Sequence, residues 1–139
     1  FGGWGVDFHA GAVTRAHADV DVAVWLKDRD KIVALLVDGG WRHAPEDGED
    51  GYTGYERGAV RLELAFVARG DDGEVYTPLS EGRAPWATGA FANDIAELAG
   101  VRARVVSLRS LRADKSELRA DPIVAAKDRA DAATLERIK

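Results

Sequence analysis

The feature that most constrains the fold is an alternating stretch at residues 18–26. Valines at positions 20, 22 and 24 alternate with Asp19, Asp21 and Ala23. A period of two predicts a β-strand with one buried face, because successive side chains point to opposite sides of a sheet. Asp19 and Asp21 therefore project from the same, non-core face of one strand.

Residues 59–67 form a second alternating stretch, with Glu63 and Arg61 on the non-core face. If the two strands are neighbours, the carboxylates of Asp19, Asp21 and Glu63 converge. Converging carboxylates repel one another unless a cation lies between them, and Mg²⁺ prefers such oxygen ligands. The pattern favours a site for two-metal phosphoryl transfer. The alternative is that these side chains are only the solvated face of an antiparallel sheet.

The rest of the chain predicts helices and strands in a mixed order. A helix is expected at residues 4–10, after a turn at Gly2–Gly3, and another is expected after Asp28. Further helices are expected at residues 91–98, 108–115 and 122–139. Further strands are expected at residues 52–57, 74–77 and 101–106. Asp28, Ser107 and Asp121 are the expected N-caps of the helices that follow them. The sum is an α+β domain, a mixed sheet flanked by helices.

Composition narrows the class of protein. With 139 residues and 46% hydrophobic content, the chain is expected to be one compact domain. No apolar run approaches membrane length, and the absence of cysteine fits a reducing cytoplasm. The net charge of −5 argues against nucleic acid as a partner and is compatible with a cationic ligand.

The first 21 residues carry the most specific pattern. Glycines at positions 2 and 3 would let backbone amides approach a phosphate at the start of a helix. The motif positions are Gly2-Gly3-Trp4, Asp7, Gly11, Thr14-Arg15, His17, Asp19 and Asp21. This set resembles the signature of the aminoglycoside and lincosamide nucleotidyltransferases, which share the DNA polymerase β-like fold. The segment Lys127-Asp128-Arg129-Ala130-Asp131 resembles the closing helix of that family.

The resemblance implies a fold, an activity and partners. Residues 1–139 would be a single nucleotidyltransferase domain of the polymerase β-like fold that lacks an N-terminal helix and strand segment. It would move AMP from ATP to a hydroxyl of a small molecule, an aminoglycoside or lincosamide as first expectation, and release pyrophosphate. Two Mg²⁺ ions would assist. No membrane is expected as a partner, and a homodimer is left open.

The resemblance also implies site residues. The catalytic and metal-binding positions are Asp19, Asp21 and Glu63, and the nucleotide-binding positions are Gly2, Gly3, Arg15, His17 and Lys127. The family usually has aspartate where this chain has Glu63, whose side chain is one methylene longer. That departure favours an alternative, a non-catalytic nucleotide-binding or scaffold protein of the same fold. A further alternative is a toxin–antitoxin nucleotidyltransferase that acts on a protein or tRNA.

Three local expectations remain open. Asp7 is expected to brace the segment around Arg15. Lys127 and Asp131 are four residues apart on the expected inward face of the last helix, where they would pair, unless Lys127 reaches nucleotide phosphates. The loop at residues 45–51 concentrates four acids that would either steer a cationic acceptor or be simply solvated. These acids are Glu46, Asp47, Glu49 and Asp50.

Overall fold

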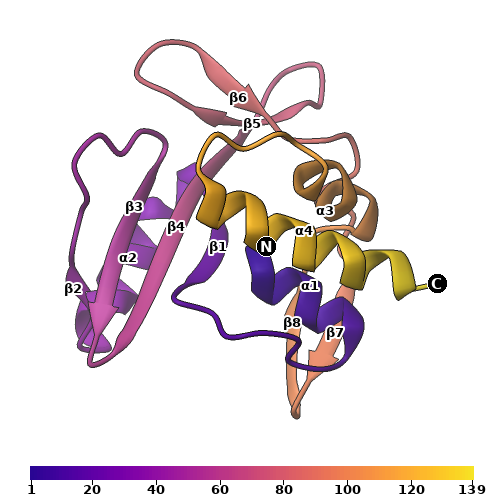
Figure 1. The fold of residues 1–139 in the computed structure, drawn as a ribbon. Helices are drawn as coiled ribbons and strands as arrows, with labels where there is room; N and C mark the ends of the chain where they lie inside the picture. The colour runs from indigo at the N-terminus through magenta and orange to yellow at the C-terminus, as the bar shows by residue number, and fades with distance from the viewer. The chain divides into compact units, whose positions relative to one another are not determined.

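The computed structural model describes all residues from Phe1 to Lys139, which form two compact units. The sheet unit is Ala18–Trp86. The helical unit combines Phe1–His17 with Ala87–Lys139. Figure 1 shows the course of the chain through both. No helix is long and apolar enough to cross a membrane.

The sheet unit is built around one long strand. The strand β4 (Val60–Arg69) pairs in parallel with β1 (Val20–Trp25) and antiparallel with β3 (Tyr52–Arg57), as Figure 1 shows. A parallel pair needs a crossover connection, and the chain supplies one through a helix between β1 and the later strands. Two strands predicted only to alternate are therefore direct neighbours.

Shorter elements complete the sheet unit. They are the 3₁₀ turn η1 (Leu26–Asp28), helix α2 (Arg29–Asp38) and strands β2 (Arg42–His43), β5 (Val75–Pro78) and β6 (Arg83–Pro85). Strand β2 pairs with β3, β5 pairs with the end of β4, and β6 pairs with β5. Between β4 and β5 the chain turns at residues 70–73, where Gly70 N–H donates to the carbonyl of Glu74.

Fewer apolar residues of the sheet unit are buried than the alternating pattern predicts. Leu64 and Val67 of β4 are 2% and 1% exposed, whereas Val60 at the start of the same strand is 49% exposed. Leu35 of α2 is 61% exposed, and no residue of α2 is fully buried. The predicted cap is also wrong in detail: Asp28 precedes α2, but its side chain makes no capping hydrogen bond, because η1 leads into the helix.

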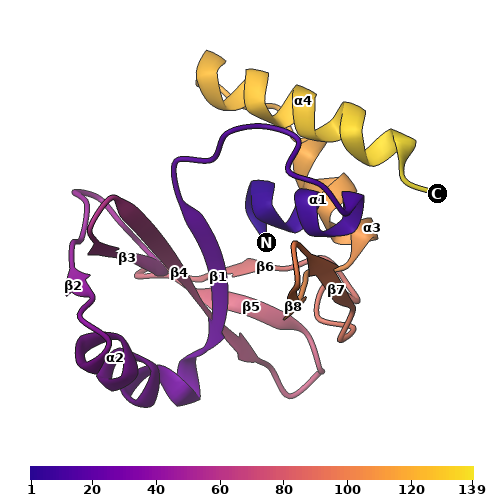
Figure 2. The same ribbon diagram turned by 90° about the horizontal axis from the view of Figure 1, so that it is seen from below.

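The helical unit has three helices and a hairpin. Its elements are α1 (Gly2–Ala10), β7 (Ile95–Leu98), β8 (Val101–Arg104), α3 (Leu108–Lys115) and α4 (Pro122–Arg137). Helix α1 packs against α3, α4 and β7, and Figure 2 shows these elements together. Val6, Leu111 and Leu135, one from each helix, form the centre of this packing at 2% exposure or less.

Two expectations for the helical unit are wrong and two are confirmed. The Gly2–Gly3 pair is not a turn before the helix but the first turn of α1 itself. Residues 91–98 do not form a helix, because residues 95–98 pair with β8 across a tight turn. Ala99 and Gly100 both have positive φ there, which matches the twist of a two-residue hairpin. Ser107 and Asp121 cap α3 and α4 as predicted.

Candidate active site

Asp21 and Glu63 are direct partners in the parallel pairing of β1 with β4. Paired residues on adjacent strands project to the same side of the sheet. Both side chains belong to residues that are half-buried, as is Asp19, which comes directly before β1. The sequence-based expectation that the two carboxylate-bearing strands are neighbours is thus confirmed.

Glu63 is engaged by an arginine of its own strand. Arg61 Nε donates to Glu63 Oε1 at 2.6 Å. The two residues are on the same face of β4, and their side chains are 18% and 15% exposed. The hydrogen bond to Glu63, opposed by desolvation, raises the pKa of Arg61 above its ordinary value. Arg61 therefore stays a cation at any pH at which the fold exists.

The donors present suit a hard divalent cation in type, since carboxylate oxygens are the ligands that Mg²⁺ takes. The strand register also places Asp21 and Glu63 side by side. The side chains are nevertheless not gathered into a group of three that would hold a metal ion. Glu63 is instead paired with Arg61. We call the side of β1 and β4 that carries Asp19, Asp21 and Glu63 the carboxylate face. Its ligand type and its strand register suit a divalent cation. Glu63, as the third ligand, would have to be shared with Arg61 or released by it.

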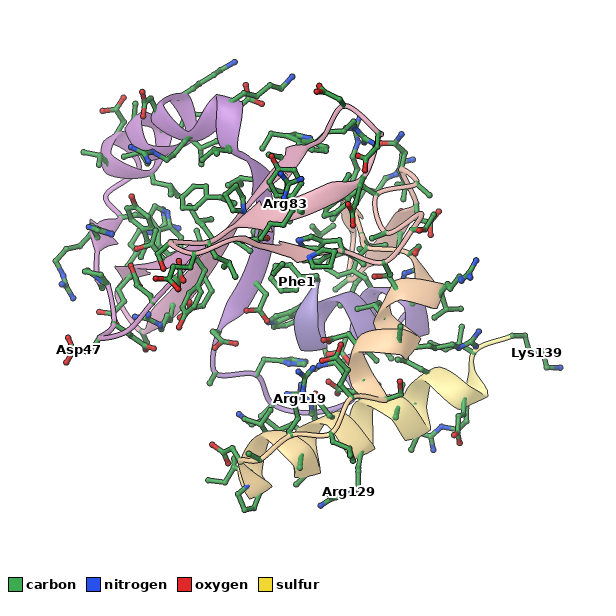
Figure 3. The ribbon with its side chains drawn as sticks, turned by 90° about the horizontal axis from the view of Figure 1, so that it is seen from above. Phe1, Asp47, Arg83, Arg119, Arg129 and Lys139 are labelled. Atoms are coloured by element: carbon green, nitrogen blue, oxygen red, sulfur yellow. The ribbon has the colours of Figure 1, made fainter.

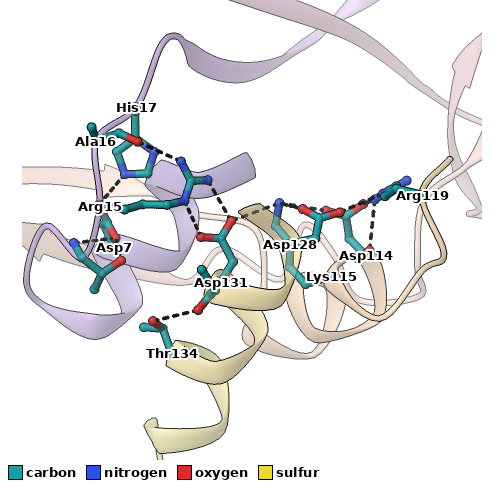
Figure 4. A network of polar contacts seen from close by, with 12 residues as sticks. Asp7, Arg15, Ala16, His17, Asp114, Lys115, Arg119, Asp128, Asp131 and Thr134 are labelled. Carbon is teal, nitrogen blue, oxygen red and sulfur yellow. Dashed lines mark hydrogen bonds and ion pairs between the residues drawn. The ribbon is translucent and has the colours of Figure 1, made fainter. Parts of the chain in front are cut away.

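In the helical unit, a buried carboxylate organises the segment after α1. Asp7 is fully buried and accepts hydrogen bonds from Thr14 N at 3.1 Å and Thr14 Oγ1 at 2.5 Å. His17 Nε2 lies 2.5 Å from the other oxygen of Asp7, and the imidazole stacks at 4.5 Å on the ring of Trp4. Asp7 therefore braces this segment as expected, through Thr14 and His17 (Figure 4).

Gly3 makes room for the two side chains that follow. A Cβ atom at Gly3 would lie 2.6 Å from ring atoms of His17 and would collide with the guanidinium of Arg15. The glycine at this position therefore allows Arg15 and His17 to lie directly against the first turn of α1. Gly3 thus lies directly against Arg15 and His17, two other predicted nucleotide-binding residues.

Arg15 is held by a carboxylate from the end of the chain. Its Nε and Nη2 donate to the two oxygens of Asp131 at 2.7 and 2.9 Å. Asp131, on α4, has a side chain only 1% exposed. Such a two-point pair orients a planar guanidinium more strictly than one contact does. Asp131 therefore fixes the direction of the Arg15 side chain.

The same carboxylate belongs to a longer chain of charges. Lys115 Nζ lies 2.8 Å from Asp128 Oδ1 and 3.3 Å from Asp131 Oδ2. Arg119 Nε then binds the other oxygen of Asp128 at 2.8 Å. Figure 4 shows this alternation of cations and carboxylates along α4. Each buried charge in it has a partner of opposite sign, as buried charges require.

The pKa values in this network report the pairing. Burial alone raises the pKa of Asp131, but the Arg15 hydrogen bond and the Lys115 charge outweigh it and leave the pKa below its ordinary value. Burial likewise raises the pKa of Asp128, and the hydrogen bonds from Lys115 and Arg119 bring it below normal. Burial lowers the pKa of Lys115, and its acidic partners raise it above normal in sum.

The predicted pair between Lys127 and Asp131 is wrong. Asp131 pairs with Arg15 and Lys115, whereas Lys127 is exposed. The buried residues of α4 are Asp128, Asp131, Thr134 and Leu135, and Asp131 among them lies on the face that was expected to point inward. Ile123, in the first turn of the helix, is 69% exposed. The buried face of this helix therefore combines an apolar contact through Leu135 with ion-paired carboxylates.

Sequence reasoning did not assign Lys115 and Arg119 to this network. The available signal was the spacing of Asp128 and Asp131, which are three residues apart and lie on one face of a helix. Two carboxylates on a face that also carries the buried Leu135 require cations from another element. Lys115 supplies one from the end of α3.

Three of the four acids in the loop at residues 45–51 have side-chain contacts with residues outside the loop. Glu46 Oε1 lies 3.2 Å from Arg61 Nη2, and Glu49 accepts from Thr53 Oγ1 at 2.5 Å. Asp50 accepts from the backbone N–H and the hydroxyl of Ser80 at 2.8 and 2.9 Å. Asp47 is exposed, and Figure 3 shows it at the edge of the sheet unit, pointing outward.

Comparison with protein families decides the classification. The family model described as aminoglycoside-2''-adenylyltransferase matches residues 1–135. The chain belongs to this family. As a member, it is a nucleotidyltransferase by class, and the α+β fold expected from the resemblance is confirmed. Comparison with curated protein sequences gives no match.

Solved structures share the fold of this chain. The lincomycin-bound lincosamide antibiotic adenylyltransferase LnuA superposes with a TM-score of 0.76 at 19% identity, covering 99% of this chain and 84% of LnuA. ANT(2'')-Ia in complex with adenylyl-2''-tobramycin gives a TM-score of 0.64 at 21% identity, covering 96% of this chain and 76% of that one. At such identities the likeness concerns the fold.

Proposed function

We propose that this member of the aminoglycoside-2''-adenylyltransferase family is a Mg²⁺-dependent enzyme that transfers AMP from ATP to a hydroxyl of a small molecule, releasing pyrophosphate. The observation that carries the proposal is the register of β1 and β4, which makes Asp21 and Glu63 direct neighbours. Asp19 lies two residues before Asp21 in the sequence. The signature of residues 2–21, which includes both aspartates, supports it.

The carboxylates have distinct roles in the proposed reaction. Asp19 and Asp21 would hold the metal ions, and Glu63 would be the third ligand and the base that takes the proton of the acceptor hydroxyl. Magnesium, when bound, supplies Lewis-acid stabilisation of the charge that develops on the phosphate oxygens. The hydroxyl oxygen would attack the α-phosphorus in line, and the bond to the pyrophosphate oxygen would break.

The residues of the helical unit would bind the triphosphate. Gly2 and Gly3 contribute backbone N–H groups at the positive end of the α1 dipole. Arg15 would face the phosphates with a guanidinium whose direction Asp131 sets. His17 would contact the triphosphate or support its loop through Asp7, and the exposed Lys127 would reach a phosphate from α4.

The acceptor we propose is an antibiotic of the aminoglycoside or lincosamide type. LnuA is described as a lincosamide antibiotic adenylyltransferase, and ANT(2'')-Ia was solved with adenylyl-2''-tobramycin. The net charge of −5 suits a cationic aminoglycoside and disfavours a nucleic acid acceptor. A cytoplasmic location, where ATP and Mg²⁺ are abundant, belongs to this proposal.

The decisive experiment combines the protein with Mg²⁺, each nucleoside triphosphate and a panel of aminoglycosides and lincosamides. The expected result is a product heavier than one antibiotic by one nucleoside monophosphate, with ATP as the preferred donor and pyrophosphate released in equal amount. Omission of the metal and the Asp21→Asn variant are the controls. Binding of ATP without any adduct or pyrophosphate across the panel would reject transfer to these antibiotics.

A second candidate is a nucleotide-binding protein of this family without catalysis. The observation that favours it is the Arg61–Glu63 pair, because it occupies an oxygen of the side chain needed as the third ligand. This candidate predicts magnesium-dependent ATP binding by calorimetry with no release of pyrophosphate. The two candidates are separated by the same assay, since only the enzyme consumes ATP in the presence of an acceptor.

A further inference from the structure

A glycine in the interior of β3 shows how closely Arg61 is fitted to the carboxylate face. Gly54 is buried and lies opposite Glu63 in the antiparallel pairing of β3 with β4. A Cβ atom there would stand 2.7 Å from Arg61 Cζ and 2.8 Å from the carbonyl oxygen of Ala44. A glycine inside a strand commonly marks such a close approach. The guanidinium of Arg61 therefore fills the place of a side chain at position 54.

The guanidinium is surrounded by acids on several sides. Besides Glu63, Arg61 binds Glu56 Oε1 through Nη1 at 3.2 Å and lies 3.2 Å from Glu46 Oε1 through Nη2. Nη1 also donates to the carbonyl of Ala44 at 3.2 Å. A cation held by three hydrogen bonds and one further ion pair does not follow its partner if that partner turns away. Arg61 is thus a fixed positive charge on the face that carries Asp21 and Glu63.

We propose that Arg61 is the internal counter-cation of the carboxylate face: it neutralises and holds Glu63 while no metal is bound, and it competes with a divalent cation for that carboxylate. The inference rests on the proposed function, since it concerns the metal affinity of the same site. Arg61 Nε binds Glu63 through the single oxygen Oε1. A metal ion would therefore either share Glu63 with Arg61 or displace it.

The proposal gives a reason for the glutamate at position 63. Arg61 and Glu63 are two residues apart on one strand face, and the glutamate carboxylate meets the guanidinium at 2.6 Å. An aspartate would hold its carboxylate one methylene nearer the strand, where Asp21 is its partner in register. The length of the side chain thus determines whether the carboxylate favours the arginine or the metal.

The test is direct titration of Mn²⁺ and Mg²⁺ into the metal-free, full-length chain by calorimetry, without nucleotide. Arg61→Gln removes the charge, and we expect Mn²⁺ affinity to rise about tenfold, because a like charge beside the site is removed. Arg61→Lys retains the charge and should stay within about twofold of the unmodified chain. Arg42→Gln is the matched control: Arg42 binds Glu56 at 2.6 Å, so it shares an acid with Arg61 but does not touch Glu63.

A second measurement uses the metal-free protein alone. Arg61→Gln should lower the Tm of the metal-free protein, since the carboxylates lose their common cation. Saturating Mn²⁺ should raise the Tm by more in this variant than in the unmodified chain. Glu63→Asp should also bind Mn²⁺ more tightly. The effects of the two substitutions on Mn²⁺ affinity should not add in the double variant, because each substitution abolishes the same ion pair.

The outcomes separate this inference from the proposed function. Unchanged or weaker Mn²⁺ binding in Arg61→Gln, with measurable binding in the unmodified chain, overturns the role of Arg61 and leaves the metal site in place. If no variant binds a divalent cation, both the metal site and the inference are rejected. Should Arg61→Gln fail to fold, as judged by circular dichroism, Glu63→Asp decides: affinity equal to or below that of the unmodified chain overturns the inference.

Discussion

Arg15 and Asp131 are joined by a two-point ion pair that connects residues 116 positions apart in the chain. The carboxylate is almost completely buried, and Lys115 approaches its second oxygen at 3.3 Å. One acidic side chain of α4 thus orients an arginine of the signature segment and neutralises a lysine of α3. This dual role makes Asp131 the residue on which most of the following stability predictions depend.

Replacing Asp131 should destabilise the protein strongly. Asp131→Asn leaves Arg15 and Lys115 without the buried counter-charge that they share, and removal of one partner from a buried pair costs about 3–5 kcal/mol. Denaturant unfolding followed by circular dichroism measures the loss. Lys127→Ala is the matched control on the same helix: its side chain is exposed, so the change should stay within about 0.5 kcal/mol. Equal effects of the two substitutions would contradict the assigned network.

The network also predicts a pH dependence of stability. The pKa values of Asp128 and Asp131 are lower in the folded chain than their ordinary values, so they stabilise the fold above the unfolded-state pKa. This contribution should begin to disappear below about pH 4 and be lost as the pH falls through the folded-state values. Lys115, whose pKa is raised, contributes below its unfolded-state pKa and loses its contribution above about pH 10.4.

The measurement is the free energy of unfolding from denaturant titrations between pH 3 and pH 7. Asp131→Asn should flatten the acid limb of this curve, since one of the two titrating carboxylates is absent. A curve of unchanged slope in that variant would show that acid sensitivity comes from other carboxylates.

Substitution of the aspartates at β1 should separate catalysis from folding. Asp19→Asn and Asp21→Asn should abolish adduct formation and leave the circular dichroism spectrum unchanged, because both residues are only half-buried. Glu63→Asp should retain or raise activity, since the change keeps a carboxylate at the third ligand position and shortens its reach toward Arg61. Product mass and pyrophosphate release are the readouts. Full activity in either asparagine variant would exclude metal binding by that aspartate.

Gly3→Ala tests the close approach at the start of α1. The added methyl group would strike Arg15 and His17, so the variant should raise the KM for ATP by about tenfold or more and should lower the Tm by several degrees. Gly5→Ala is the control in the same helix, because its Cβ would meet Leu111 only at 3.4 Å, an ordinary contact distance. If both variants bind ATP equally well, the two side chains have no role at the triphosphate.

The acidic loop yields a prediction about the acceptor. Neutralising Glu46, Asp47, Glu49 and Asp50 together should raise the KM for a cationic aminoglycoside, flatten its salt dependence and leave the KM for Mg²⁺–ATP unchanged. Asp47→Asn alone should give a smaller change of the same sign without loosening the loop, because Asp47 is exposed, whereas Glu46, Glu49 and Asp50 hold the loop through Arg61, Thr53 and Ser80. An unchanged acceptor KM at low ionic strength would favour a neutral, lincosamide-type acceptor.

Local sequence patterns determined the two carboxylate-bearing strands and the beginnings of two helices. The alternation at Asp19–Val24 and around Glu63 predicted two strands with carboxylates on one face, because the period of two is a property of the backbone. Ser107 and Asp121 predicted the beginnings of α3 and α4, since a capping side chain reaches only its own first turn. Such contacts span a few residues, and their chemistry is contained in the sequence around them.

The tertiary structure decided the features that depend on distant partners. The turn at Ala99–Gly100 let residues 95–98 pair as a strand where a helix was expected, because cross-strand hydrogen bonds outweighed local propensity. The buried face of α4 holds Asp128 and Asp131 beside Leu135, because the cations that pair with these carboxylates come from other segments. Arg61 was available to Glu63 because Gly54, on another strand, leaves space for its guanidinium. No local pattern carries these contacts, since each is formed only when separate segments pack together.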